Sequence, residues 1–126
     1  MLKDITNLAN TDNEIVLLWL YGSQARGTAG ANSDIDLAVV YKTYIDDPIA
    51  RRVRPELTAM DWCRALGLKE GALSVIDLDI VPIPLAFSVI NDDRLLVNKD
   101  DYLKMMKEQR IMSLWEEYQY LAQRYG

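Results

Sequence analysis

A segment near the N-terminus, residues 22–36, carries the residue types best suited to chemistry and reads GSQARGTAGANSDID. Asp34 and Asp36 open an apolar run, so in an extended strand both carboxylates point to one face, about 6.6 Å apart at ~3.3 Å per residue. Two neighbouring carboxylates repel each other, and a divalent cation relieves that repulsion. Because oxygen ligands suit hard cations, this aspartate pair predicts a Mg²⁺ or Mn²⁺ site.

The other end of the same segment is suited to phosphate. Gly22 and Ser23 follow an apolar run, at the point where a short helix is expected over residues 23–27. The first N–H groups of a helix are available to an anion, and glycine lets the backbone approach closely. Arg26 lies three residues after Ser23, on the same helical face. The segment therefore predicts a metal-bound polyphosphate between its Gly-Ser turn and its aspartate pair.

A later strand, expected over residues 74–83, offers a further carboxylate. Asp77 and Asp79 alternate with Val75 and Val81 on one face of that strand. A third carboxylate beside the aspartate pair would complete a two-metal site, in which one metal organises a triphosphate and the other activates a hydroxyl. It can also accept the proton of that hydroxyl. The residues themselves leave open which of the two acids takes this position.

The elements that must position these groups alternate along the chain. Continuous apolar runs are typical of strands buried on both faces, and helical periodicity separates them. Pro48 is expected in a first helical turn, whereas Pro55 is expected to break or restart that helix. The pattern predicts one α/β or α+β domain over residues 1–126. Strands are expected over 15–21, 34–41, 74–83 and 94–98, and helices over 1–10, 23–27, 46–67 and 100–126. A loop is expected over 28–33, and a short segment over 85–91 leads to the last strand, which gives the order αβαβαβαβα with short links.

Composition limits the chemistry and the partners. The chain has 126 residues and no histidine, which excludes histidine bases and most zinc sites, so catalysis must rest on carboxylates and a hard cation. The single cysteine, the polar N-terminus and the lack of a long apolar run favour a cytoplasmic protein with no membrane association. A net charge of −5 argues against direct binding to duplex nucleic acid.

The motif as a whole resembles a known superfamily. Gly22-Ser23, ten residues, Asp34-x-Asp36 and a later acidic strand resemble the nucleotidyltransferases related to DNA polymerase beta. The fuller stretch GSQARGTAGANSDIDLAVV is similar to the minimal nucleotidyltransferases, or MNT proteins, which include antitoxins paired with HEPN-domain RNases. The resemblance extends from Glu14 to the end of the third strand. It implies a polymerase-beta-like fold, with a small mixed sheet flanked by helices and a long C-terminal helix.

The resemblance also implies roles for the residues. The aspartate pair would bind Mg²⁺ or Mn²⁺, and the Gly-Ser turn would bind the phosphates of ATP. Asp79 is favoured as the third catalytic and metal-binding carboxylate, with Asp77 as the alternative. In that antitoxin family, AMP is moved from ATP to a tyrosine near the RNase site of the toxin. The chain would then be a protein adenylyltransferase, the antitoxin of a type VII-like pair, in a hetero-oligomer with its HEPN toxin.

Two other functions remain open at this point. The chain would be a nucleotidyltransferase acting on a small molecule or RNA, or a non-catalytic antitoxin that acts by binding only. Length favours a protein acceptor, because the catalytic elements occupy most of the chain and leave little structure to hold another acceptor.

The last expected helix has an apolar face that recurs at three- and four-residue steps. All of that face packs within the molecule, or its final stretch, WEEYQYLAQRY at residues 115–125, contacts a partner. Tryptophan and tyrosine are common interface anchors. Tyr120 and Tyr125 are the residues of this stretch that the core can most easily spare.

Overall fold

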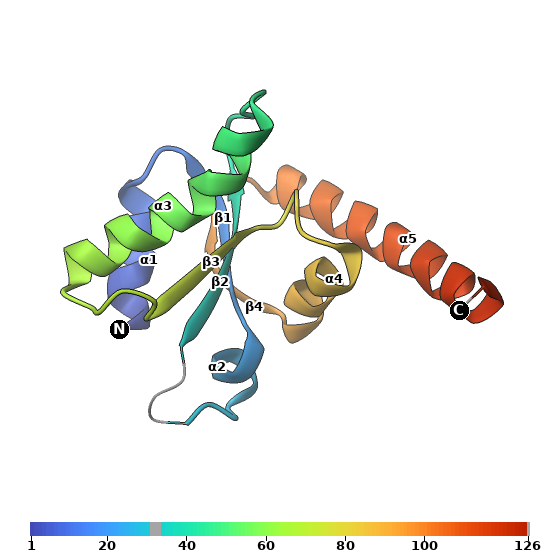
Figure 1. The fold of residues 1–126 in the computed structure, drawn as a ribbon, viewed down its shortest axis with the longest axis horizontal. Coiled ribbons are helices and arrows are strands. Elements are labelled where there is room, and N and C mark those ends of the chain that lie inside the picture. Colours follow the sequence, from blue (N-terminus) through green and yellow to red (C-terminus); the bar gives the residue numbers. More distant parts are fainter. Residues whose placement is uncertain (31–33, 126) are drawn as a thin grey trace.

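The computed structural model describes residues 1–30 and 34–125, which form a four-stranded sheet with helices on both faces (Figure 1). In chain order the elements are α1 (Leu2–Thr11), β1 (Ile15–Tyr21), α2 (Gly22–Arg26), β2 (Ile35–Tyr41), α3 (Pro48–Leu66), β3 (Leu73–Asp77), α4 (Ile83–Asp92), β4 (Arg94–Asn98) and α5 (Asp101–Tyr125). The strands lie in the order β3-β2-β1-β4. Strand β1 is antiparallel to β2 and β4, whereas β2 is parallel to β3, so the sheet is mixed as predicted.

Two apolar layers cover the sheet. Leu37 and Val39 of β2 belong to the layer under α1 and α3. Ala38 and Val40 belong to the layer under α4 and α5, on the opposite side of the sheet (Figure 1). Because side chains alternate along a strand, Asp36 points to the same side as Ala38. The α4 side of the sheet therefore also carries the aspartate pair.

The third strand is shorter than predicted. β3 ends at Asp77, not at residue 83, because the carboxylate of Asp77 accepts the N–H of Asp79 at 3.0 Å. The carbonyl of Asp77 also accepts the N–H of Ile80 at 3.1 Å, which turns the chain away from the sheet. An aspartate that bonds the backbone two residues onward is a common turn device. The apolar pattern in the sequence continues beyond this turn because Leu78 is still buried in the core. The pattern alone therefore predicted a longer strand.

The expectation that Pro55 breaks its helix is wrong. Pro55 is buried inside α3, which runs on without interruption to Leu66. An interior proline costs roughly 3 kcal/mol, so the packing of α3 against β3, with Trp62 buried, offsets that cost. The helix starts at Pro48, two residues later than expected, with Asp47 as its N-cap. Pro48 lies in the first turn, as predicted.

The long C-terminal helix is also as predicted, but only its first part packs on the molecule. α5 packs on α4 and then runs away from the sheet (Figure 1). Ile111 is buried, whereas Tyr120 is 59% and Tyr125 is 77% exposed. The alternative in which the whole apolar face packs within the molecule is therefore wrong for the end of the helix. None of the helices in the described ranges is long and apolar enough to cross a bilayer.

Candidate active site

The structure brings the two ends of the 22–36 segment together. Tyr21, the last residue of β1, is the register partner of Asp36 on β2, so Gly22 lies against the Asp36 carboxylate. A Cβ built on Gly22 would be 2.5 Å from Asp36 Oδ2, and the φ angle of Gly22 is +75°. Only glycine suits both the close approach and the left-handed backbone. This contact between the Gly-Ser turn and the aspartate pair forms the centre of the candidate site.

Electrostatics at this end of the sheet favour a cation. Asp34 is exposed and immediately precedes β2, and Asp36 is partly buried. Burial and then the negative charge of Asp34 raise the pKa of Asp36, while the positive charge of Arg26 lowers it. Burial and the charge of Asp36 raise the pKa of Tyr21 to about 12. Ionised Asp36 is thus disfavoured by its surroundings, and a nearby cation would stabilise it.

A further acid at this end, Asp92, was missed by sequence reasoning. The Oδ2 atom of Asp92, at the end of α4, accepts the N–H of Gly22 at 2.9 Å and lies 3.3 Å from Arg26 Nη1. The Gly22 N–H, expected to meet a phosphate, is therefore engaged by a carboxylate. Asp92 is 70 residues from Gly22, so no local pattern could reveal it. Its contacts fix the Gly-Ser turn and orient Arg26.

The short helix that carries Ser23 and Arg26 is close to the prediction. α2 begins one residue earlier than expected, at Gly22, and Gly27 in the left-handed conformation ends it. The expected loop over residues 28–33 falls partly on 31–33, which lie outside the described residues. Ser23 and Arg26 therefore stand on one turn of helix beside the aspartate pair.

Neither Asp79 nor Asp77 joins this site. Asp36 pairs with Ser74 across β2 and β3, and Val39 pairs with Asp77. Asp77 is therefore three residues farther along the sheet, roughly 10 Å at ~3.3 Å per residue, and points to the α3 side. Within the described ranges, no three His, Cys, Asp or Glu side chains are grouped closely enough to hold a metal ion. The expectation of one site with three carboxylates is wrong in this structure.

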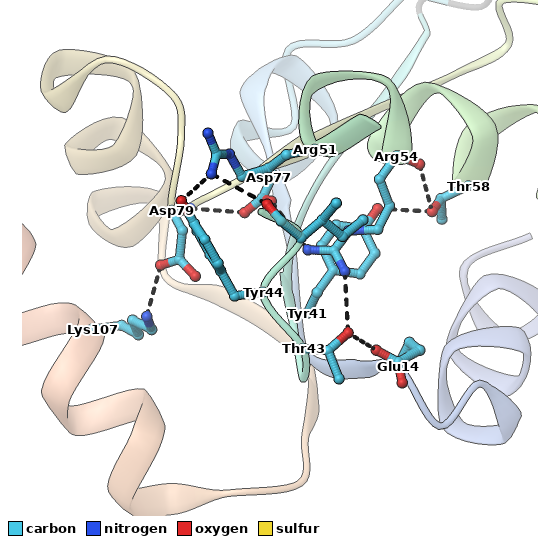
Figure 2. Close-up of polar contacts among 11 residues, drawn as sticks. Glu14, Tyr41, Thr43, Tyr44, Arg51, Arg54, Thr58, Asp77, Asp79 and Lys107 are labelled. Carbon is cyan, nitrogen blue, oxygen red and sulfur yellow. Dashed lines mark hydrogen bonds and ion pairs between the residues drawn. The ribbon is translucent and has the colours of Figure 1, made fainter. Parts of the chain in front are cut away.

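Asp77 and Asp79 instead form ion pairs at the opposite end of the sheet (Figure 2). Asp77 is 3% exposed and lies 3.9 Å from Arg54 Nη2. Asp79 Oδ1 is 2.9 Å from Lys107 Nζ. Burial raises the pKa of Asp77 more than Arg54 and the Asp79 N–H lower it. These two acids connect the end of β3 to α3 and α5, so their position is explained by packing.

A cavity of about 250 Å³ lies beside these ion pairs. Arg54 lines it, with its guanidinium 3.9 Å from the centre of the Tyr41 ring, and Arg51 lies over Tyr44 at 4.7 Å. Arg51, Arg54 and Lys107 line this cavity, and each already faces an aromatic ring or a carboxylate (Figure 2). Within the part of the chain that the structure describes, Asp77 and Asp79 therefore have ion-pair partners, whereas Asp34 and Asp36 have none.

The donors at the Gly22 end fit one hard cation. Mg²⁺ is usually held by one or two carboxylates together with substrate phosphates and water. Asp34 and Asp36 supply the carboxylates, and Gly22 leaves the space in front of Asp36 that a Cβ would fill. Ser23 and Arg26 lie on α2 beside this pair and could bind phosphates of the same ligand. A bound Mg²⁺ or Mn²⁺ would supply neutralisation of phosphate charge.

The chain belongs to the polymerase beta nucleotidyltransferase family, whose model matches residues 3–102. No curated protein sequence matches it. The predicted polymerase-beta-like fold is therefore confirmed, and the structure adds the long C-terminal helix beyond the matched residues.

Several solved structures share this fold. A toxin–antitoxin complex with AMP-PNP is 23% identical, with a TM-score of 0.76 over 98% of this chain and 93% of that chain. The MntA–HepT toxin–antitoxin is 22% identical, with a TM-score of 0.67 over 97% and 89%. A tri-AMPylated Shewanella oneidensis HEPN toxin in complex with MNT antitoxin is 19% identical, with a TM-score of 0.69 over 98% and 94%.

Proposed function

We propose that this protein is a Mg²⁺-dependent protein adenylyltransferase, the cytoplasmic antitoxin of a type VII-like toxin–antitoxin pair. It transfers AMP from ATP to a tyrosine of a partner HEPN RNase and so inactivates the RNase. The observation that carries the proposal is the close approach of Gly22 to the Asp36 carboxylate. It brings a Gly-Ser turn suited to phosphate next to a pair of carboxylates suited to a metal ion. Membership of a nucleotidyltransferase family and likeness to toxin–antitoxin complexes, one with AMP-PNP and one with an AMPylated toxin, support it.

The proposed reaction has a simple atom balance. The tyrosine oxygen forms a bond to the α-phosphorus of ATP, the bond from that phosphorus to the bridging oxygen breaks, and pyrophosphate leaves. The tyrosine proton passes to water. Asp34 and Asp36 would hold the cation, and Ser23 and Arg26 would bind phosphate oxygens. Asp92 keeps Arg26 in place. Catalysis of phosphoryl-type transfer rests mainly on positioning and charge stabilisation, which these residues supply.

The projecting end of α5 is the proposed contact surface for the partner. The ring of Trp115 stacks on Phe87 of α4, with ring centres 4.5 Å apart, and on Tyr118, with ring centres 5.6 Å apart. These contacts hold the start of this surface against α4. Beyond it, Tyr120 and Tyr125 are exposed. Exposed aromatic residues on a rigid helix are effective interface anchors. The hetero-oligomer would form along this helix and bring the acceptor tyrosine to the Gly22 end of the sheet.

One observation favours a second candidate, the non-catalytic antitoxin that acts by binding only. Within the described residues, no third carboxylate is grouped closely enough with the aspartate pair to share a metal ion with it. Such an antitoxin would keep its partner surface on α5 and use the nucleotide site, if at all, as a structural element. A transferase that acts on a small molecule or RNA has no comparable support.

Intact mass spectrometry tests the proposal. The neighbouring-gene product is incubated with this protein, ATP and Mg²⁺, beside Asp34→Asn and the matched variant Asp79→Asn from the other end of the sheet. We expect the partner to gain one or more AMP masses with the wild type and Asp79→Asn but none with Asp34→Asn. A stable complex without mass gain would support binding only. Mass gain on RNA or a small molecule in the absence of the partner would contradict the protein acceptor.

A further inference from the structure

Position 74 is the place on β3 that lies next to Asp36. Ser74 is the register partner of Asp36, and register partners of neighbouring strands lie about 4.8 Å apart. Leu73 and Val75 face the α3 layer, so Ser74 and Asp36 share the α4 side of the sheet. Ser74 is exposed and β3 is an edge strand. A carboxylate at residue 74 would therefore stand beside the aspartate pair, where two-metal chemistry requires a third acid.

No other acid among the described residues takes the place of a third carboxylate beside Asp34 and Asp36. Asp77 and Asp79 are engaged by Arg54 and Lys107 at the far end of the sheet. Asp92 accepts the N–H of Gly22 and faces Arg26. The hydroxyl of Ser74 is neutral at physiological pH, so it neither bridges two cations nor takes a proton from an acceptor as a carboxylate does.

We propose that Ser74 restricts the site to a single divalent cation, so that the chain binds nucleotide but transfers AMP slowly. This inference rests on the proposed adenylyl transfer and names the residue that sets its rate. A charge count agrees with it: one divalent cation neutralises the two carboxylates of Asp34 and Asp36, and no negative charge from the protein remains to attract a second. The toxin partner is then held by contact first and modified later.

Manganese EPR tests the number of cations directly. The protein is saturated with Mn²⁺ and α,β-methylene-ATP, whose methylene bridge prevents transfer. We expect the wild type to give the spectrum of isolated protein-bound Mn²⁺. Ser74→Asp should give a spin-coupled pair, because the two metals of such sites lie about 3.5–4 Å apart. Ser74→Asn, which matches aspartate in size but lacks its charge, should behave as the wild type.

The rate of AMP transfer to the partner gives a second, separate measurement. General base catalysis contributes at least about 10²-fold, so Ser74→Asp should modify the partner about 10²-fold faster than the wild type in a mass-spectrometric time course. Ser74→Asn should give no acceleration. Because Ser74 is exposed on an edge strand, we expect both variants to fold.

The outcomes separate this inference from the proposed function. A coupled pair in the wild type, or isolated Mn²⁺ in folded Ser74→Asp, would overturn the inference even if AMP is transferred. A coupled pair in Ser74→Asp without transfer by any variant would leave the inference standing and contradict the proposed transferase. If Ser74→Asp does not fold, the wild-type spectrum alone decides, since an isolated ion supports the inference and a pair overturns it.

Discussion

The two ends of the central sheet use the same residue type for different purposes. At the Gly22 end, burial and then the charge of Asp34 raise the pKa of Asp36, and Arg26, the cation that lowers it, is shared with Asp92. At the other end, Asp77 and Asp79 each face a basic side chain. The second arrangement pairs each acid with a base of the fold, whereas the first leaves negative charge that a bound cation would neutralise. The neighbours of a carboxylate, and not its presence on a strand, therefore indicate its role.

The strongest test of this comparison is the pair of variants Asp36→Asn and Asp79→Asn. Mutation of a group that only supports a metal ligand lowers metal affinity or activity about 10–100-fold. Loss of the proposed ligand Asp36 itself should therefore lower AMP transfer at least about 10²-fold. Asp79→Asn should stay within about threefold of the wild type. Partner modification followed by mass spectrometry measures both. Equal losses at the two ends would remove the functional distinction between them.

Gly22→Ala sharpens the comparison at the first end. The new methyl group would meet Asp36 Oδ2, and the positive φ adds strain, so we expect a loss of about 3 kcal/mol in the free energy of unfolding. Gly27→Ala is the matched control, because its φ is +73° but nothing lies within 4 Å of the added Cβ. It should lose only about 1 kcal/mol. Urea unfolding of both variants gives the difference, and similar losses would show that the contact with Asp36 is unimportant.

Asp77→Ala probes the second end. Burial outweighs the attraction of Arg54 for the Asp77 carboxylate, so the loss should come from the freed Asp79 N–H and from the unpaired Arg54 guanidinium. We expect about 2 kcal/mol less stability in urea unfolding, with AMP transfer retained at a temperature where the variant is folded. Asp34→Ala, an exposed acid, should change stability by less than about 0.5 kcal/mol. A larger loss of stability in Asp34→Ala than in Asp77→Ala would contradict the assignment of a structural role to the Asp77 end of the sheet.

The pH dependence of stability gives the smallest expected effect. Because the folded-state pKa of Asp36 is raised above 3.8, its ionisation opposes folding; the penalty is absent below pH 3.8 and appears as pH rises through the folded pKa. Without metal, Asp36→Asn should therefore melt at a higher temperature than the wild type at pH 7, and the two melting temperatures should converge towards pH 3.8. Added Mg²⁺ should remove the advantage of the variant at pH 7. A lower melting temperature for Asp36→Asn at pH 7 would contradict this sign.

The sequence predicted the part of the site that is local. Residues 22–36 connect two antiparallel neighbours, β1 and β2, so their two ends must meet wherever those strands pair. The third carboxylate was predicted wrongly because its place depends on the register between β2 and β3, which are separated along the chain by α3. Alternation tells which residues of one strand share a face, but not which residue of the next strand lies opposite.

Other differences have the same origin in long-range packing. Asp92 reaches Gly22 from 70 residues away, and the helix containing Pro55 is held by burial against β3. The strand that was expected to end at residue 83 ends at Asp77, because that side chain bonds the backbone of Asp79. The elements themselves, their order and the long last helix needed only local pattern, and these were predicted correctly.

The last turns of α5 have a consequence for dynamics. Every residue from Glu116 to Tyr125 is exposed, and a helical segment of that length is marginal in water without tertiary support. In the free protein these turns should fray with little energetic cost, and their amide hydrogens should exchange far faster than those of β1. A partner that covers them must supply the free energy that orders them. Its binding would therefore appear as slowed hydrogen exchange along this one helix.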